Sequence, residues 1–171
     1  MPGADPSARK IAFDPVVDAN TRLLILGSLP GDASLKAGQY YGHPQNAFWR
    51  LVGGAIGTDL AALPYPDRLA ALKSARIGLW DVIARAERKG SLDADIRNAE
   101  AADLRRLITD LPQLRAVAFN GATAAKIGRR SLAGVEGLTL IDLPSSSPAH
   151  ATRSFADKAQ AWAVLTAILH S

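Results

Sequence analysis

The sequence predicts an α/β fold, a single-domain three-layer α/β/α sandwich with a central four-stranded parallel sheet. Short continuous apolar segments alternate along the chain with segments of helical periodicity, which favours a parallel sheet with helices on its faces. The chain has 171 residues, of which 48% are hydrophobic, so it is long enough for one domain with a sizeable core. Since no internal repeat or linker is visible, we expect a polar N-terminal arm over residues 1–20 and one domain over residues 21–171.

Four apolar segments are the expected strands. Each is short and continuous rather than alternating, which is typical of strands buried on both faces of a parallel sheet. They cover residues 23–26, 77–83, 116–119 and 138–143.

Helices are expected between and after these strands. Residues 104–111 place leucine and isoleucine at helical spacing, and Ser154 with Asp157 three residues later resembles a capping box that opens the last helix. Further helices are expected over residues 48–56, 66–75 and 122–127. Residues 85–99 are polar and charged, so we expect a surface loop whose Arg85, Arg88 and Lys89 form a solvated face.

The composition restricts the possible partners. Twenty Lys and Arg against sixteen Asp and Glu give a formal net charge of +4, a mild preference for anionic partners such as nucleic acid. The absence of cysteine excludes disulfides, thiol catalysis and cysteine-ligated metal. No apolar run is long enough to span a bilayer and no secretory signal is visible, so we expect a cytoplasmic protein without a membrane partner.

Three of the strands run into unusual loops. These are residues 27–34, 120–121 and 145–150, rich in Gly, Ser, Pro and Asn. Because the carboxyl ends of parallel strands share one edge of the sheet, the three loops are expected to converge on one pocket. Residues 40–49 add tyrosines, a histidine, an amide and further aromatic rings, a mixture that suits the binding of a flat polar ring.

Several of these side chains have two interpretations. Asn46 either reads a base or orients a water molecule, or it caps the helix that begins near Phe48. Asn120 is either a second amide that reads a base edge or a turn residue before Gly121. Asp81 ends an apolar run, where a buried site carboxylate is possible and a capping role is favoured.

The serine-rich loop and the histidines are equally open. Hydroxyl and N–H groups at Ser145, Ser146 and Ser147 could hold a phosphate, or the loop could be solvated with serine turns. The three histidines are too scattered for a metal cluster, so no metal is expected. His43 and His150 remain candidates for contact with a ligand or with DNA.

Taken together, three segments resemble motifs of the uracil-DNA glycosylase superfamily. Residues 27–31 (Gly-Ser-Leu-Pro-Gly) resemble its first motif, and residues 143–150 (Leu-Pro-Ser-Ser-Ser-Pro-Ala-His) resemble its second. Residues 43–49 resemble the segment that carries a base-stacking aromatic in the mismatch-specific branch. Leu29 stands where many branches place a water-activating Asn or Asp, and the combination of motifs is similar to the hypoxanthine-DNA glycosylase branch.

The resemblance implies a monofunctional glycosylase that removes hypoxanthine from deoxyinosine in double-stranded DNA and leaves an abasic site. It implies that Asn46 is the critical amide, aided by backbone N–H groups near Ser28, and that Phe48 stacks on the everted base. No cofactor is implied, and a monomer associated with the nucleoid is expected. The residues expected to line the base pocket are Gly27, Leu29, Pro30, Gly31, Tyr41, His43, Phe48 and Asn120. Those expected to contact DNA are Ser34, Ser145, Ser146, Ser147, Pro148, Ala149 and His150.

Three other readings remain open. One is a mismatch-specific uracil or thymine glycosylase, against which Leu29 argues. Another is a non-catalytic α/β module that binds a nucleotide or nucleic acid. The third is a hydrolase that uses Ser28 or Ser147, although no nucleophile elbow is present.

Overall fold

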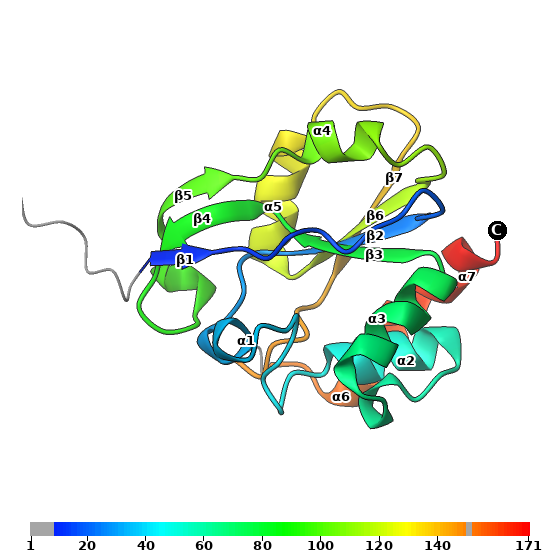
Figure 1. Ribbon diagram of the computed structural model, residues 1–171, viewed down its shortest axis with the longest axis horizontal. Helices are drawn as coiled ribbons and strands as arrows, with labels where there is room; N and C mark the ends of the chain where they lie inside the picture. The colour runs from blue at the N-terminus through cyan, green and yellow to red at the C-terminus, as the bar shows by residue number, and fades with distance from the viewer. Residues whose placement is uncertain (1–8, 150–151) are drawn as a thin grey trace, which may run out of the picture.

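The computed structural model describes residues 9–149 and 152–171, and its centre is a four-stranded parallel sheet with the order β3-β2-β6-β7 (Figure 1). The strands are β2 (Leu23–Gly27), β3 (Ile77–Asp81), β6 (Ala116–Asn120) and β7 (Thr139–Leu143). All four expected strands are therefore present. The register pairs Gly27 with Asp81 and Asn120 with Leu143, so that the strands end together at one edge.

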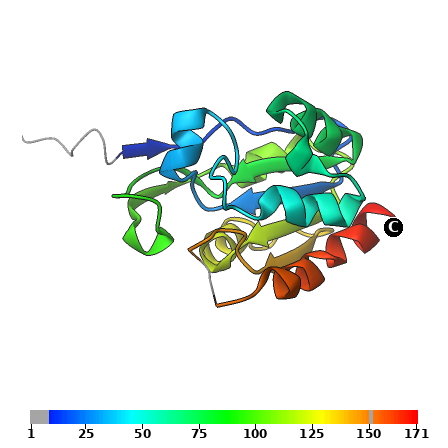
Figure 2. The ribbon, with the colours of Figure 1, turned by 90° about the horizontal axis from the view of Figure 1, so that it is seen from below.

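Helices cover both faces of this sheet, which confirms the three-layer sandwich. One face carries α2 (Phe48–Ile56), α3 (Tyr65–Ser74), α6 (Phe155–Trp162) and α7 (Val164–Leu169). The other face carries α4 (Leu104–Thr109) and α5 (Ala122–Ser131). Figure 2 shows the first group in front of the strands. The short elements α1 (Asp32–Ala37), η2 (Leu60–Ala62) and η3 (Asp93–Asp95) lie in the connections.

Strand β2 shows how the sequence divides the core. Leu23 and Ile25 point into the layer of α2, α3, α6 and α7, whereas Leu24 and Leu26 point into the layer of α4 and α5. All four side chains are fully buried. Each such leucine or isoleucine contributes about 1.5–3 kcal/mol of hydrophobic free energy, so the continuous apolar segment is explained by burial on both faces.

The ends of the helices follow local chemistry. The Ser154 hydroxyl accepts a hydrogen bond from the Asp157 N–H at 3.1 Å, which confirms the capping role expected at the start of the last helix. That helix divides at Ala163 into α6 and α7. Gly57 ends α2 in the left-handed conformation (φ 71°), which a residue without Cβ adopts without strain.

A second, antiparallel sheet corrects one expectation. It has the order β1-β4-β5, with β1 (Arg9–Ile11), β4 (Ile83–Glu87) and β5 (Arg97–Ala101). Residues 85–99 were expected to form a surface loop, but they include most of this hairpin. The sequence shows no alternation of apolar and polar residues that would predict this hairpin. Every residue of β5 is exposed, and only Ile83 and Ala86 of β4 are buried.

The expected strand over residues 77–83 is interrupted at Val82. There the chain leaves the large sheet and continues into β4, while the Val82 N–H still donates to the Gly27 carbonyl at 2.8 Å. The Ile83 N–H donates to the Ser28 carbonyl at 3.2 Å. This bend brings the hairpin beside the loop that follows β2.

The described part of the segment expected as a polar arm is built into the domain. Val16 and Leu79 exchange two backbone hydrogen bonds of 2.9 Å. The Tyr40 hydroxyl donates to the Asp14 carbonyl at 2.7 Å, and the Trp80 indole N–H donates to the Phe13 carbonyl at 3.0 Å. Within residues 9–149 and 152–171, no helix has the length and apolar character needed to cross a membrane.

Candidate active site

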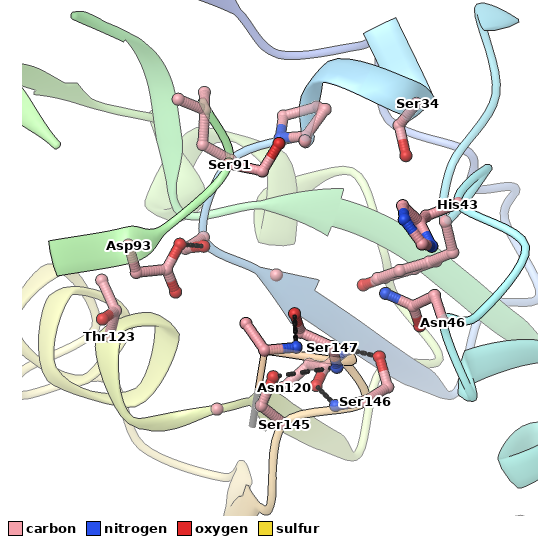
Figure 3. Close-up of a pocket in the computed structure, with 18 of the residues that line it drawn as sticks. Ser34, His43, Asn46, Ser91, Asp93, Asn120, Thr123, Ser145, Ser146 and Ser147 are labelled. Carbon is pink, nitrogen blue, oxygen red and sulfur yellow. Dashed lines mark hydrogen bonds between the residues drawn. The ribbon is translucent and has the colours of Figure 1, made fainter. Parts of the chain in front are cut away.

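A pocket of about 470 Å³ lies at the carboxyl ends of the parallel strands (Figure 3). This volume is within the range of small-molecule sites. All four parallel strands lead into its wall, and two further segments complete it. The lining residues come from residues 27–34, Asp81, residues 120–123 and residues 145–149, with residues 40–46 and 91–93 contributing the rest.

Most of the residues predicted from sequence meet at this pocket. Those that line it are Gly27, Ser28, Leu29, Pro30, Gly31, Ser34, Tyr41, His43, Asn46, Asn120, Ser145, Ser146, Ser147, Pro148 and Ala149. Phe48 does not line it. His150 lies outside the described residues. The expected convergence of the three loops is thus what the fold produces.

Asp81 is a buried carboxyl group of the pocket wall. It is only 4% exposed, and its Oδ2 atom has no hydrogen-bond partner among the described residues. Burial, reinforced by the negative charge of Asp93 and opposed by Arg88, raises the pKa of Asp81 to about 7. The element that follows Asp81 is strand β4 rather than a helix, so the favoured capping interpretation is wrong. The alternative interpretation, a buried carboxyl group at the pocket, is what the structure has.

Gly27 leaves room for this carboxyl group. A Cβ atom at Gly27 would lie 2.7 Å from Asp81 Oδ1 and 3.1 Å from the Tyr41 hydroxyl. The first distance is shorter than real Cβ contacts and the second is unusually tight, so close packing favours glycine at this position.

Gly27→Ala is therefore expected to lower the free energy of unfolding by about 1–3 kcal/mol and to distort the pocket. Chemical denaturation measures the change. Gly54→Ala is the matched control, because a Cβ at that helical position meets nothing within 4 Å, and it should stabilise the protein by up to about 1 kcal/mol. Equal effects of the two changes would contradict the close contact at Gly27.

Tyr41, rather than Phe48, presents an aromatic ring to the pocket. Phe48 is fully buried and stacks on Tyr41 with ring centres 3.8 Å apart and an interplanar angle of 13°. Phe48 thus supports the ring that faces the cavity, and the prediction that Phe48 itself contacts the base is corrected. Trp49 fixes the same segment, since its indole N–H donates to the Tyr41 carbonyl at 3.2 Å.

Asn46 makes a hydrogen bond at the start of α2, although the N-cap residue of this helix is Ala47, so the capping interpretation of Asn46 is not what the structure has. Its Oδ1 accepts a hydrogen bond from the Phe48 N–H at 3.0 Å, at the start of α2. Its amide nitrogen points toward the centre of the pocket (Figure 3). The Ala47 N–H donates to the Ser146 carbonyl at 3.0 Å and so ties this segment to the serine-rich loop. Asn46 is therefore held in place by its oxygen and directed at the cavity by its nitrogen.

Asn120 holds the serine-rich loop. Its Nδ2 donates to the Ser146 hydroxyl and its Oδ1 accepts from the Ser146 N–H, both at 2.9 Å. Asn120 and Ser146 are both buried. These bonds give Asn120 a positioning role, and its role as a reader of a base edge stays a prediction, because they leave one amide N–H unused. Ser146 was predicted to contact DNA, but its hydroxyl and N–H are buried and bonded to Asn120.

The rest of the serine-rich loop contains the serine turns that were the alternative to phosphate binding. Ser145 Oγ accepts from the Ser147 N–H at 3.1 Å, and Ser147 Oγ accepts from the Ala149 N–H at 3.2 Å. The Ser147 carbonyl also accepts from the Lys158 amino group at 3.4 Å. Pro144 is held by the Trp162 indole, whose N–H donates to its carbonyl at 2.9 Å. Pro148 and Ala149 are exposed at the rim.

Ser34 and His43 hold the loop that carries the tyrosines. The Ser34 hydroxyl accepts from the Gly42 N–H at 2.9 Å, and His43 Nδ1 accepts from the Gln45 N–H at 3.0 Å. Ser34 is buried, whereas His43 is exposed at the pocket. The Ser34 side chain thus fixes a turn rather than presenting itself to DNA as predicted.

Sequence reasoning missed residues 91–93, which form part of the pocket wall. Ser28 Oγ donates to Asp93 Oδ1 at 2.7 Å, so the first loop and the hairpin are joined directly. Arg88, expected on a solvated face, is instead buried and donates to the Pro30 and Gly90 carbonyls. A basic residue in a polar stretch gives no sequence signal of burial, and only the fold reveals this connection.

The fold is an α/β sandwich, and its pocket joins a Gly-Ser-Leu-Pro-Gly loop to a Pro-Ser-Ser-Ser-Pro-Ala loop. Together these features indicate a DNA glycosylase. Residues 15–166 match the family described as the uracil DNA glycosylase superfamily, and the chain belongs to it. The resemblance inferred from the three motifs is confirmed.

Relatives point to one branch of this family. A protein of Methanosarcina acetivorans named hypoxanthine DNA glycosylase is 47% identical over 141 residues, which cover 82% of this chain and 88% of the relative. A protein of the same name from Methanosarcina barkeri is 50% identical over 113 residues, covering 66% of this chain and 72% of the relative. A solution NMR structure described as a candidate uracil DNA glycosylase from M. acetivorans has a TM-score of 0.84 and 42% identity, covering 95% of this chain and 99% of that one.

Proposed function

We propose that this protein is a DNA glycosylase of base-excision repair that hydrolyses the N-glycosidic bond of hypoxanthine in DNA and leaves an abasic site. The observation that carries the proposal is the pocket at the sheet edge, where the Asn46 amide and the Asp81 carboxyl face one cavity. The two relatives named hypoxanthine DNA glycosylase, at 47% and 50% identity, support the same activity.

The chemistry of the pocket suits an everted purine with a lactam edge. Hypoxanthine carries an N1–H donor beside the O6 acceptor. A protonated Asp81 carboxyl in the pocket wall would form a hydrogen bond to this edge of the base. Its pKa of about 7 keeps a large fraction of this group protonated near neutral pH. Tyr41, supported by Phe48, would stack on the ring, a contact worth ~1–3 kcal/mol.

Cleavage then depends on groups that stabilise charge as it develops. The glycosidic bond breaks through an oxocarbenium-like state, and negative charge moves onto the leaving base. The Asn46 amide nitrogen and a protonated Asp81 are donors that would stabilise this charge. Leu29 occupies the place of a water-orienting residue and has no polar atom for the purpose, so the attacking water must be held elsewhere, and Asn46 is the candidate.

The DNA partner would contact the rim of the pocket. Everting a nucleotide costs a few kcal/mol of stacking and pairing, least where the base is mispaired. Pro148 and Ala149 are exposed and line the pocket, which supports the proposal that they would press against the duplex, with Ser145 and Ser147 beside them. We propose double-stranded DNA with a deaminated base as the substrate of a monomeric enzyme, associated with the nucleoid.

One assay tests the function directly. Duplexes that contain deoxyinosine, uracil opposite guanine, or thymine opposite guanine are incubated with the protein, and the released base and the strand are analysed. We expect hypoxanthine release to be fastest and the strand to remain uncut, because among the described residues no lysine lines the pocket to form a Schiff base.

The other outcomes identify the alternatives. Fastest release of uracil or thymine would make the protein a mismatch-specific glycosylase. The solved structure at 42% identity, which is described as a candidate uracil DNA glycosylase, is the reason to include uracil in the assay. Retention of DNA without release of any base would identify a non-catalytic binding module. Strand cleavage with trapping by borohydride would contradict a monofunctional mechanism.

A further inference from the structure

Arg88 is a fully buried arginine behind the wall of the pocket. Its side chain has no exposed surface, and it is not one of the residues that line the cavity. Its Nε donates to the Gly90 carbonyl at 3.0 Å, and its Nη2 donates to the Pro30 carbonyl. Replacing a buried ion pair by well-packed apolar side chains is often neutral for stability, so stability alone does not explain an arginine at this place.

The two segments that Arg88 joins both belong to the site. Pro30 lies in the Gly27–Gly31 loop, and Gly90 lies in the loop between β4 and β5, here called the hairpin loop (residues 88–93). The Ser91 hydroxyl accepts from the Asp32 N–H at 2.9 Å, and a Cβ atom at Gly31 would lie only 3.2 Å from Ser91 Oγ. The two loops thus pack closely and form one side of the pocket (Figure 3).

Arg88 also carries a charge that Asp93 balances. Its Nη1 lies 3.7 Å from Asp93 Oδ1 and has no hydrogen-bond partner among the described residues, so the two groups interact mainly through their charges. Arg88 lowers the pKa of Asp81, whereas Asp93 raises it. Tyr40 and Tyr41 also face Asp81, and because burial raises the pKa of each, both stay uncharged. The charges that act on Asp81 from the hairpin loop are therefore those of Arg88 and Asp93.

We propose that Arg88 is a positioning residue of the reaction, which holds the Gly27–Gly31 loop against the hairpin loop and, paired with Asp93, balances the charge beside the pocket. This inference rests on the proposed function. Arg88 does not reach the cavity, so it acts through Pro30 and through Asp93, which accepts from the Ser28 hydroxyl at 2.7 Å. A displacement of about 1 Å in such a wall is enough to cost up to about 100-fold in rate.

Arg88→Lys tests the positioning role, because lysine keeps the positive charge but lacks the planar fork that reaches two carbonyls at once. We expect kcat for hypoxanthine release to fall by about ten- to 100-fold, with little change in KM, since Arg88 does not contact the DNA. Arg105→Met is the matched control. Arg105 on α4 also donates to two carbonyls, those of Ser131 and Ala133, but it is exposed and does not line the pocket. Its replacement should leave kcat unchanged.

Two further variants test the charge balance with effects of opposite sign. Arg88→Met removes the positive charge, so Asp81 should keep its proton to higher pH and the fall of kcat/KM should move to higher pH. Asp93→Asn removes the negative charge but keeps an oxygen that can accept from Ser28, so the fall should move to lower pH. Arg88→Lys should keep the wild-type midpoint. A purely structural role would not produce opposite shifts, and Asp93→Asn supplies a readout even where Arg88→Met does not fold.

The midpoint can also be measured in the free protein, from the ¹³C NMR shift of the Asp81 carboxyl carbon as a function of pH. Wild-type kcat in Arg88→Lys would overturn the positioning role. Equal midpoints in the wild type and Asp93→Asn would overturn the charge balance. A wild-type protein that releases no hypoxanthine, although its NMR midpoint moves as expected in the variants, would refute the proposed function and support the charge balance, so the two failures are distinguishable.

Discussion

Asn46→Ala is expected to lower kcat/KM for hypoxanthine release by roughly 100-fold or more, the usual cost of removing a donor aimed at developing charge. The amide nitrogen of Asn46 faces the pocket, and Leu29 offers no polar replacement. Single-turnover kinetics on a deoxyinosine duplex measure the change. The hydrogen bond from the Phe48 N–H is lost as well, which should cost about 1 kcal/mol of stability.

Asn46→Asp separates these two roles. The aspartate keeps an oxygen that can accept from the Phe48 N–H, so stability should stay close to that of the wild type. It lacks the amide N–H donor, so excision should fall as it does in Asn46→Ala. Full activity in Asn46→Asp would show that the oxygen, and not the nitrogen, serves the reaction, and full activity in Asn46→Ala would remove Asn46 from the mechanism.

The second large effect is expected at Asp81, and it depends on pH. An ionised carboxylate in the pocket would oppose the negative charge of the leaving base, so the protonated form should be the active one. Since the pKa of Asp81 is raised to about 7, kcat/KM should fall above pH 7, approaching ten-fold per pH unit. Asp81→Asn, which stays neutral, should abolish this fall, and Asp81→Leu should lose most activity at every pH.

Stability should change with pH in a related way. A carboxyl group whose pKa is raised on folding binds its proton more tightly in the folded state, so the free energy of unfolding decreases as pH rises from about 4 to about 7. Asp81→Asn should remove that part of the slope and be more stable than the wild type at pH 8. Thermal unfolding across this range measures it, and a wild-type profile identical to that of Asp81→Asn would contradict the raised pKa.

The strands and the strand-end loops were predictable because their signals are local. Residues 23–26 are continuously apolar as burial on both faces requires, and Gly27–Gly31 with the serine-rich loop follow such strands directly. The parallel register then brings the loops together, and this explains why the convergence on one pocket could be derived from sequence.

The contacts that organise the pocket were not predictable, because each joins residues far apart in the chain. The polar stretch that contains Arg88 and Asp93 reads as a surface loop, yet it pairs as a hairpin and reaches Ser28. Similarly, only the folded structure shows that Phe48 stacks behind Tyr41 and that the Asn120 amide forms two hydrogen bonds with Ser146. The sequence indicates which side chains are available to the pocket. Their burial and hydrogen-bond partners in the folded structure decide the role of each one.

Two of the three tryptophans are attached to the walls of the pocket through their indole nitrogens, Trp49 to the Tyr41 carbonyl and Trp162 to the Pro144 carbonyl. Both rings also meet Phe48 edge to face. The protein thus contains built-in optical reporters, whose ultraviolet emission should respond when the aromatic segment or the serine-rich loop shifts on DNA. DNA binding can therefore be followed in real time without attaching a dye to the enzyme.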